Sequence, residues 1–361
     1  MNFKTILFCT ILINYSILKA QYVVDFKLHY GYVLPFYDAI EYVVNTGVYS
    51  ADITLLKKTK GKDFWEVLYK YPLYGIGISF SNLGNDKVYG YATSLYFCFD
   101  YTLFKNKYYG ISTIFNSGYS YINRKFDVYD NYLNRAIGSH NNIFIRFSVL
   151  TNLDFYNDHK LLFDCSFTHY SNGKTKSPNY GLNILTFSAG IRFNINNFST
   201  KKSNKIDLPT IPAFKKFNHY LIVSGGNKVY DNLLNLNYKF FTITYQLAYV
   251  KSWLKQYGTG ISVFYDESVG EAINKDVGLY DNRMNIRFRV ATYVARIFRF
   301  KNLMFHIMAG YYVYSKYTDL TPFYTRMFLQ YYFINKLSFG IGLKAHMAKA
   351  DMLEWGFGIK L

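Results

Sequence analysis

The sequence lacks long apolar runs, has little proline and has very little cysteine. Beyond residue 20, no stretch supplies the ~18 consecutive apolar residues that indicate a membrane-spanning helix. Of 361 residues, 6 are Pro and 3 are Cys. Cys9, Cys98 and Cys165 are too few for a disulfide scaffold and have no metal-ligand spacing around them. We therefore exclude a helical membrane protein and a disulfide-stapled domain, and we expect Cys98 and Cys165 to be buried apolar residues.

Acidic residues are also scarce, with 23 Asp and Glu against 41 Lys and Arg, a formal net charge of +18. The chain opens MNFKTILFCTILINYSILKAQ, with Lys4, an apolar stretch and a small residue at Ala20. Residues 1–20 are therefore predicted to be a secretory signal peptide. An exported chain does not meet nucleic acid, so its basic residues either face an anionic membrane surface or occupy loops and a lumen. The sequence leaves both readings open.

What the chain does contain is aromatic residues, 21% of the total, with 39 Tyr and 33 Phe. Half of the residues are hydrophobic, yet the mean hydropathy is −0.05, so apolar and polar residues must be finely interleaved. The stretches FTITYQLAY (241–249) and RMNIRFRV (283–290) alternate strictly, which places the two kinds on opposite faces of a strand. This pattern is typical of an outer-membrane β-barrel, with lipid outside and a polar lumen inside.

Sixteen stretches of this kind predict an all-β fold, a transmembrane antiparallel barrel of about 14–16 strands. We expect residues 1–20 to be removed and residues 21–361 to form the barrel. The polar stretch 196–214 separates a first portion, 22–196, from additional strands in 215–361, which we expect to complete the same barrel.

One strand end carries unexpected polar residues, in HYSNGKTKSPNYGLN (169–183). In the predicted strand 160–171, Phe163, Cys165 and Phe167 share the lipid-facing side with His169 and Ser171. Asn183 lies on the same side of the following strand. If the hairpin is symmetric about Ser177, Ser171 faces Asn183, and the three polar side chains cluster at one rim.

That cluster has a chemical interpretation. Serine becomes a nucleophile when an adjacent base takes its proton, and histidine suits that role near neutral pH. Asn183 could orient the imidazole by accepting from its ring N–H, while Asn172 and Gly173 could donate to an oxyanion. The alternative is that polar residues at a strand end simply lie among lipid headgroups. If both chain ends are periplasmic, this hairpin lies at the outer leaflet, beside the acyl esters of lipid A.

The same residues resemble the signature of the PagL-type lipid A 3-O-deacylases, or acyloxyacyl hydrolases, which are outer-membrane barrels. The matching positions are His169, Tyr170, Ser171, Asn172, Pro178, Asn179 and Gly181. The resemblance implies that Ser171 is the nucleophile, His169 the base and Asn172 an oxyanion-hole residue. Asn183 departs from the pattern, because better-known members carry Glu there. The compact pattern covers about residues 22–196.

The chain also resembles a longer, Bacteroidetes-like subgroup of that family, and its second half matches only that subgroup. The resemblance rests on WEVLYKYPLYGIGISFSNLGN (65–85), AIGSHNN (136–142), FYDES (264–268) and AHMAKADMLEWGFG (345–358). His346 and Glu354 alternate with apolar residues, so we interpret them as lumenal, whereas the direction of Asp351 in its turn is not predictable. Ser139 and His140 are sequence neighbours that point to opposite faces, and we expect them to order a loop.

These observations predict a serine esterase of the Gram-negative outer membrane that removes the 3-O-linked hydroxyacyl chain from lipid A. Its catalytic residues would be Ser171, His169 and Asn183, with no metal or cofactor. Its partner would be lipopolysaccharide in the outer leaflet, not nucleic acid, and the oligomeric state is not predicted. The alternatives are a non-catalytic channel or structural barrel of the same lineage, which ion conductance would reveal, and an outer-membrane phospholipase, which substrate competition would reveal.

Overall fold

The computed structural model describes most of the chain from Tyr22 to Leu361. No helix in these residues is long and apolar enough to cross a membrane. The predicted signal peptide, 1–20, lies outside the described residues. The described ranges are 22–156, 159–195, 209–210, 212–230, 236–270, 284–316, 321–346 and 349–361.

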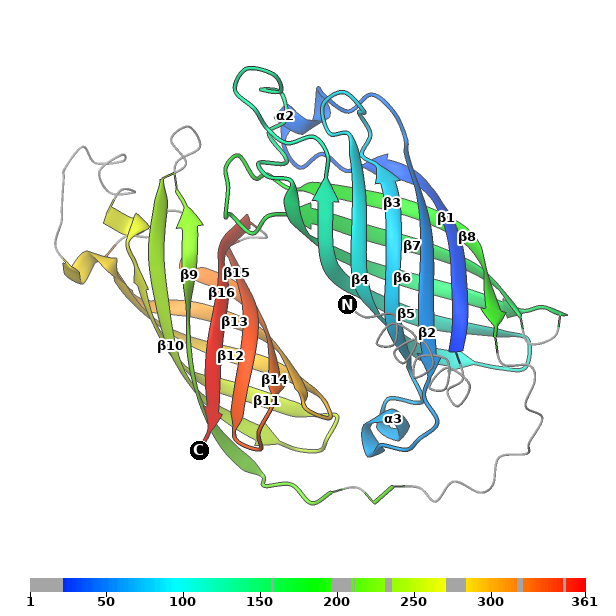
Figure 1. Ribbon diagram of the computed structural model, residues 1–361. Helices are drawn as coiled ribbons and strands as arrows, with labels where there is room; N and C mark the ends of the chain where they lie inside the picture. The colour runs from blue at the N-terminus through cyan, green and yellow to red at the C-terminus, as the bar shows by residue number, and fades with distance from the viewer. Residues whose placement is uncertain are drawn as a thin grey trace, which may run out of the picture. The chain divides into compact units, whose positions relative to one another are not determined.

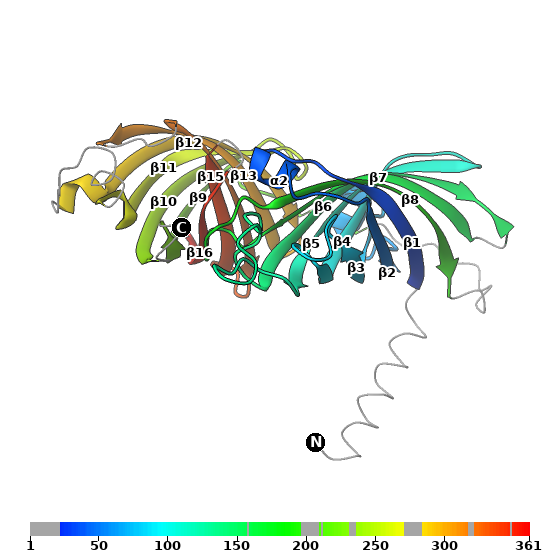
Figure 2. The same cartoon turned by 90° about the horizontal axis from the view of Figure 1, so that it is seen from above.

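The first eight strands form a closed antiparallel barrel in chain order (Figures 1 and 2). Closure is made by β1 and β8, which pair along their length from Val23 opposite Asn194 to Val33 opposite Ile184. Two short helices interrupt the connections, α2 (Asp38–Glu41) after β1 and α3 (Phe64–Leu68) after β2. The strands are β1 (Tyr22–Val33), β2 (Val48–Lys58), β3 (Leu73–Asn82), β4 (Tyr91–Lys105), β5 (Tyr109–Ile122), β6 (Asn141–Asp154), β7 (Lys160–Ser171) and β8 (Leu182–Asn194).

The last eight strands form a second closed barrel, in which β16 returns to pair with β9. The 3₁₀ helix η2 (Met284–Arg287) replaces the first half of the stretch RMNIRFRV, which was predicted as strand throughout. The stretch alternates over eight residues, which favours a strand, and the tertiary structure overrides this local pattern over Met284–Arg287. The strands are β9 (Phe217–Val229), β10 (Asn237–Val250), β11 (Gln256–Asp266), β12 (Phe288–Phe300), β13 (Leu303–Ser315), β14 (Phe323–Tyr332), β15 (Leu337–His346) and β16 (Lys349–Lys360).

The all-β class and the number of strands are therefore confirmed, but the prediction of one barrel of about 14–16 strands is wrong. The sixteen strands close as two barrels of eight, and the chain divides into two compact units. Alternation specifies which residues face lipid, and it is the same in either arrangement. Closure depends on which edge strands bond to each other, and that long-range choice leaves no periodic signal.

The lumen of the first barrel is filled by buried charges that pair across it. An eight-stranded barrel has an interior just wide enough for side chains, so buried charges there need partners within reach. The pairs are Lys27 with Asp164 at 2.8 Å, Arg192 with Asp25 at 2.7 Å and with Asp100 at 2.9 Å, and Arg146 with Asp52. The polar face predicted for strand 160–171 thus points inward.

The outer faces of both barrels carry exposed aromatic and aliphatic side chains, as expected for a surface that meets lipid. Leu28 is 71% exposed and Phe187 is 64% exposed, although both lie in the middle of their strands. Cys98 is buried as predicted, but Cys165 is exposed on this face, so that half of the cysteine prediction is wrong.

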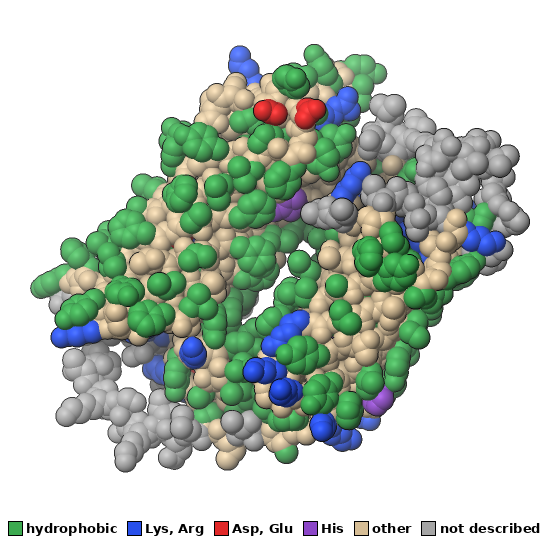
Figure 3. Space-filling model, turned by 180° about the vertical axis from the view of Figure 1, so that it is seen from behind, with side chains coloured by type: hydrophobic (Ala, Val, Ile, Leu, Met, Phe, Trp, Pro, Cys, Tyr) green, Lys and Arg blue, Asp and Glu red, His purple; other side chains and the backbone are tan. Residues whose placement is uncertain are grey.

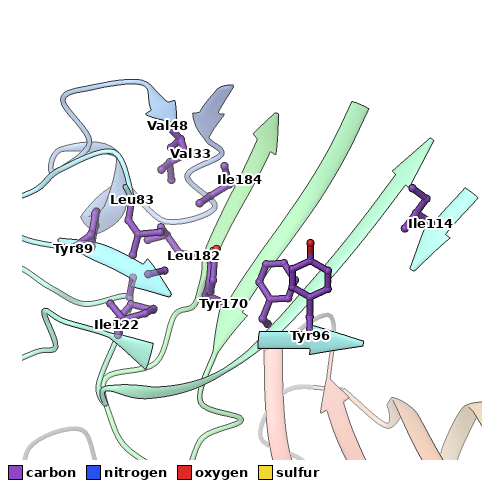
Figure 4. Close-up of a cluster of buried hydrophobic side chains, with 14 of the residues drawn as sticks. Val33, Val48, Leu83, Tyr89, Tyr96, Ile114, Ile122, Tyr170, Leu182 and Ile184 are labelled. Carbon is purple, nitrogen blue, oxygen red and sulfur yellow. The ribbon is translucent and has the colours of Figure 1, made fainter. Parts of the chain in front are cut away.

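An apolar cap fills one end of the first barrel. It is built by the connections that follow β1, β3 and β5, together with the start of β8 (Figure 4). Leu83, Tyr89 and Ile137 come from these connections and are fully buried, and they pack with Leu182 and Ile184 of β8. The cap fixes the start of β8, where the polar cluster lies.

Candidate functional site

His169 and Asn183 are direct partners in the pairing of β7 with β8. The prediction that the hairpin places Ser171 opposite Asn183 is wrong, because Asn183 lies opposite His169, two residues before Ser171 in β7. Ser171 instead lies opposite Ile143 of β6, two residues beyond His169 on the same outward face. That separation is about 7 Å along a strand, within reach of a histidine side chain leaning toward the strand end.

The side chains of His169 and Asn183 are hydrogen-bonded, with Nδ1 of His169 2.7 Å from Oδ1 of Asn183. An amide oxygen only accepts, so the ring nitrogen facing it carries the proton. The other ring nitrogen, Nε2, is then an acceptor. Ser171 and Asn183 are each only 6% exposed. The geometry therefore presents an oriented, base-competent imidazole beside a shielded serine.

Gly181 makes room for the imidazole. Its φ is +74°, and a Cβ there would lie 2.7 Å from Cε1 of His169 and 3.4 Å from Nε2. The Gly181 N–H donates to the carbonyl of Ala136 at 3.1 Å, and the Tyr180 N–H donates to that of Arg135 at 3.3 Å. The connection between β5 and β6 thus holds the glycine against the ring.

The start of β8 is held from its other side by the connection that contains α2. The Leu34 N–H donates to the backbone oxygen of Asn183 at 2.7 Å. The rings of Tyr37 and Tyr180 stack with their centroids 4.5 Å apart. These contacts were not predicted, because they join segments nearly 150 positions apart and neither segment carries a motif for them.

The turn between β7 and β8 is organised by Asn172. Its backbone N–H donates to Oδ1 of Asn179 at 3.1 Å, and its side-chain amide donates to the Lys176 carbonyl at 3.0 Å. Its Oδ1 accepts from the Thr175 N–H at 3.1 Å. Both kinds of donor on Asn172 are thus engaged within the turn. The oxyanion role of Asn172 and Gly173 stays a prediction, and for Asn172 it would use the second N–H of the side-chain amide or replace one of these acceptors.

An apolar lane runs from the polar cluster down the outer face. His169 lies beside Ile145 of β6, and the next outward position of β7, Phe167, lies between Phe147 and Leu185. These side chains alternate with buried lumenal ones along each strand. A hydrocarbon chain whose ester lies at the cluster would have apolar neighbours along this lane.

The other residues singled out from the sequence lie elsewhere. Ser139 donates to the backbone oxygen of Asn141 at 2.6 Å, and His140 Nδ1 lies 2.7 Å from the oxygen of Ile122, so they order the loop as predicted.

His346 and Glu354 are buried inside the second barrel, which confirms their lumenal assignment. Glu354 bonds Arg326 at 2.5 Å and Ser224 at 2.6 Å. Asp351 also points inward, with Lys344 at 2.6 Å. Among the residues described, no group of three or more His, Cys, Asp or Glu is placed to hold a metal ion.

The two closed barrels and their exposed apolar faces define an integral β-barrel protein of the Gram-negative outer membrane. Residues 50–192 match the family described as lipid A 3-O-deacylase (PagL), and residues 217–361 match the acyloxyacyl hydrolase C-terminal domain. The two matches cover most of the chain, which belongs to the PagL family of lipid A 3-O-deacylases.

Solved structures similar to the chain include a surface protein and an outer membrane protein. Neisserial surface protein A is 12% identical, with a TM-score of 0.31, over 48% of this chain and 97% of its own. The outer membrane protein Omp33 of Acinetobacter baumannii is 7% identical, with a TM-score of 0.18, over 95% of this chain and 99% of its own. No curated protein matches the chain in sequence.

Proposed function

We propose that the chain is a lipid A 3-O-deacylase in which Ser171 is the nucleophile, His169 the general base and Asn183 the residue that orients the base. The observation that carries the proposal is the 2.7 Å contact between His169 and Asn183 on the outward face, beside Ser171. It leaves Nε2 of His169 able to accept the serine proton.

The reaction follows from these positions. Nε2 of His169 removes the proton from Ser171 as Oγ attacks the acyl carbonyl, and the C=O electron pair moves to oxygen. Backbone or side-chain donors of Asn172 and Gly173 stabilise that oxyanion. Collapse of the intermediate breaks the ester bond, and the imidazolium returns its proton to the departing 3-hydroxyl. Water, activated by the same histidine, then releases the hydroxy fatty acid from Ser171.

Asn183 makes this site weaker in one respect than a site with a carboxylate. The amide oxygen fixes the ring orientation and the protonated nitrogen, but it carries no charge to stabilise the imidazolium formed during attack. We therefore expect a slower chemical step than with Glu or Asp at this position.

The connections of the first barrel support a substrate in the outer leaflet. The end that carries the cluster bears connections of 8 to 18 residues: 34–47, 83–90, 123–140 and 172–181. At the other end, where β1 begins, two of the three connections are short, 106–108 and 155–159, and the third, 59–72, contains α3. Outer-membrane barrels place short turns in the periplasm and longer loops outside, so the cluster is expected beside lipid A.

The channel alternative is disfavoured by the lumen. Each barrel has only eight strands, and its interior is occupied by paired charges, such as Lys27 with Asp164 and Arg326 with Glu354. The phospholipase alternative uses the same three residues on a glycerophospholipid ester. Competition between lipid A and phospholipid for the purified protein separates it from the first proposal.

The deciding experiment is mass spectrometry of lipid A from outer membranes that contain the wild-type chain or Ser171→Ala. Loss of one hydroxyacyl chain in the wild type alone supports the activity and the nucleophile together. Unchanged lipid A in both, with the protein folded in the membrane, overturns the lipid A assignment.

A further inference from the structure

One end of the second barrel carries Lys and Arg side chains but no Asp or Glu among its described residues. This basic end comprises the described residues 212–220, 247–259, 294–306, 330–341 and 355–361, which contain no Asp or Glu. It contains nine Lys and Arg residues, and Figure 3 shows such side chains gathered at the lower end of this barrel. They are Lys215, Lys216, Lys251, Lys255, Arg296, Arg299, Lys301, Lys336 and Lys360.

The acidic residues of the second barrel that the structure describes lie elsewhere. Asp266 and Glu267 follow one another at the far end of β11, and Asp351 and Glu354 are buried in the lumen against Lys and Arg. Among the residues that the structure describes, the carboxylates of the second barrel therefore lie away from the basic end. Charge of one sign gathered on one rim creates a positive potential that attracts anionic partners.

Connection lengths within the second barrel indicate which side of the membrane the basic end faces. Residues 251–255, 301–302 and 333–336 form its short turns, and β16 ends there. At the other end, three of the four connections are longer than these turns, 230–236, 267–287 and 316–322, and the fourth is 347–348. Short turns of outer-membrane barrels are periplasmic, so the basic end is expected at the inner leaflet, which consists of phospholipid.

Arg296 favours a lipid over a soluble partner. It belongs to the outward face of β12, directly opposite Tyr257 of β11, and its guanidinium lies 5.0 Å from the ring centroids of Tyr257 and Phe298. It donates to the carbonyls of Gln256, at 2.8 Å, and Leu254, at the end of the strand. A cation among lipid-facing rings that reaches toward the strand end is positioned at the level of headgroup phosphates.

Two further cations of the basic end lie near aromatic rings. The Lys216 ammonium lies 5.9 Å from the ring centroid of Tyr249, and the Arg299 guanidinium lies 5.0 Å from that of Trp253. Phe217, Tyr257 and Phe333 are exposed beside them. Basic residues above an aromatic belt suit the boundary between hydrocarbon and anionic headgroups.

We propose that the basic end of the second barrel binds anionic phospholipid headgroups in the inner leaflet, with phosphatidylglycerol as the simplest example. This function is separate from ester hydrolysis at Ser171. It would select the lipids around the second barrel and fix the depth at which that barrel sits.

The test is electron spin resonance on the full chain reconstituted in phosphatidylcholine bilayers with spin-labelled lipid. A Ser171→Ala background keeps the probe lipids intact. The expected result is a larger motionally restricted fraction for labelled phosphatidylglycerol than for labelled phosphatidylcholine, with the difference falling as salt is added. Equal fractions for the two lipids would overturn the proposal, whether or not the chain hydrolyses lipid A.

Two triple variants with the same change in charge localise the effect. Lys251, Lys255 and Lys336 are exposed in the short turns, and their replacement by Gln is expected to remove most of the preference. Lys239, Lys316 and Lys349 are exposed at the opposite end, and their replacement by Gln is expected to leave it unchanged. Equal losses in the two variants would overturn the assignment to the basic end. The proposal would also be overturned if the two labelled lipids gave equal fractions while the chain bound an acidic polymer through Lys251, Lys255 and Lys336. That result would indicate a soluble anionic partner.

Discussion

Nδ1 of His169 lies 2.7 Å from Oδ1 of Asn183, and the two residues face each other across the β7–β8 ladder. The pairing of the strands therefore sets the orientation of the imidazole, and the asparagine needs no flexible loop to reach it. A backbone hydrogen bond from Leu34 to Asn183 anchors the same position from the other side.

Ser171→Ala is expected to reduce deacylation by at least about 10⁴-fold, because the acyl-enzyme cannot form. The barrel should be unaffected, since the change removes one hydroxyl at a strand end. The rate is measured as hydroxy fatty acid released per mole of protein, and folding by the heat-dependent shift of the barrel on gels. Substantial residual activity in a folded variant would assign the nucleophile elsewhere.

Asn183→Leu is expected to lower kcat by about 10²-fold or more, because the imidazole loses the acceptor that fixes its orientation. Asn183→Asp keeps an oxygen acceptor and adds a charge beside the imidazolium, so its kcat should equal or exceed that of the wild type. The backbone bond from Leu34 is retained in both variants. Equal rates for the Leu and Asp variants would remove Asn183 from the mechanism.

Gly181→Ala is expected to lower kcat about tenfold or more, because the new Cβ would lie 2.7 Å from Cε1 of His169 and displace the ring. Its positive φ adds strain of about 1–2 kcal/mol. Gly61→Ala is the matched control, with φ of +80° in the connection after β2 and only side chains in contact. If both variants lose activity to the same extent, backbone strain and not displacement of His169 is the cause.

Arg192→Met is expected to destabilise the first barrel by about 3–5 kcal/mol, because it leaves Asp25 and Asp100 buried without their partner. Lys160→Met removes an ion pair of the same barrel, with Asp154, whose side chains are 18% and 37% exposed, and should cost at most about 1 kcal/mol. Urea unfolding in lipid bilayers measures the free energy of unfolding of both variants. Similar losses of stability in the two variants would mean that burial does not determine how much these ion pairs contribute to stability.

A chain that ends at residue 195 is expected to form a complete barrel, because β8 bonds to β1 and leaves no open edge. It should retain deacylase activity, since His169, Ser171 and Asn183 lie within it. Folding is followed by the same gel shift, and activity by release of hydroxy fatty acid. An unfolded or aggregated product would show that the first barrel requires residues beyond 195 to fold.

Sequence alternation identified the sixteen strands and their faces, although it also predicted strand over Met284–Arg287, which form η2. Period two placed His169 outward and Asp164 inward, and it placed Glu354 in a lumen. It did not identify the closing pair, because the bond between β1 and β8 joins residues such as Val23 and Asn194 that carry no local sign of their partner.

The polar cluster was predictable as a set but not in its register. The turn between β7 and β8 pairs His169, not Ser171, with Asn183, because the hairpin is centred one residue earlier than the assumed Ser177. The role of Gly181 depends on a clearance from His169 and on hydrogen bonding by Ala136, and neither distance can be derived from residue spacing. Such three-dimensional contacts separate what the sequence predicts from what the structure adds.

Because each barrel closes on itself, an insertion or deletion in one half shifts no hydrogen-bond register in the other. The two halves can therefore diverge at different rates. Selection for chemistry acts on a few positions near the β7–β8 turn, whereas β9–β16 can change its loops and its charge without altering them. A comparison of substitution rates along the chain in related species would show this as a step between the two halves.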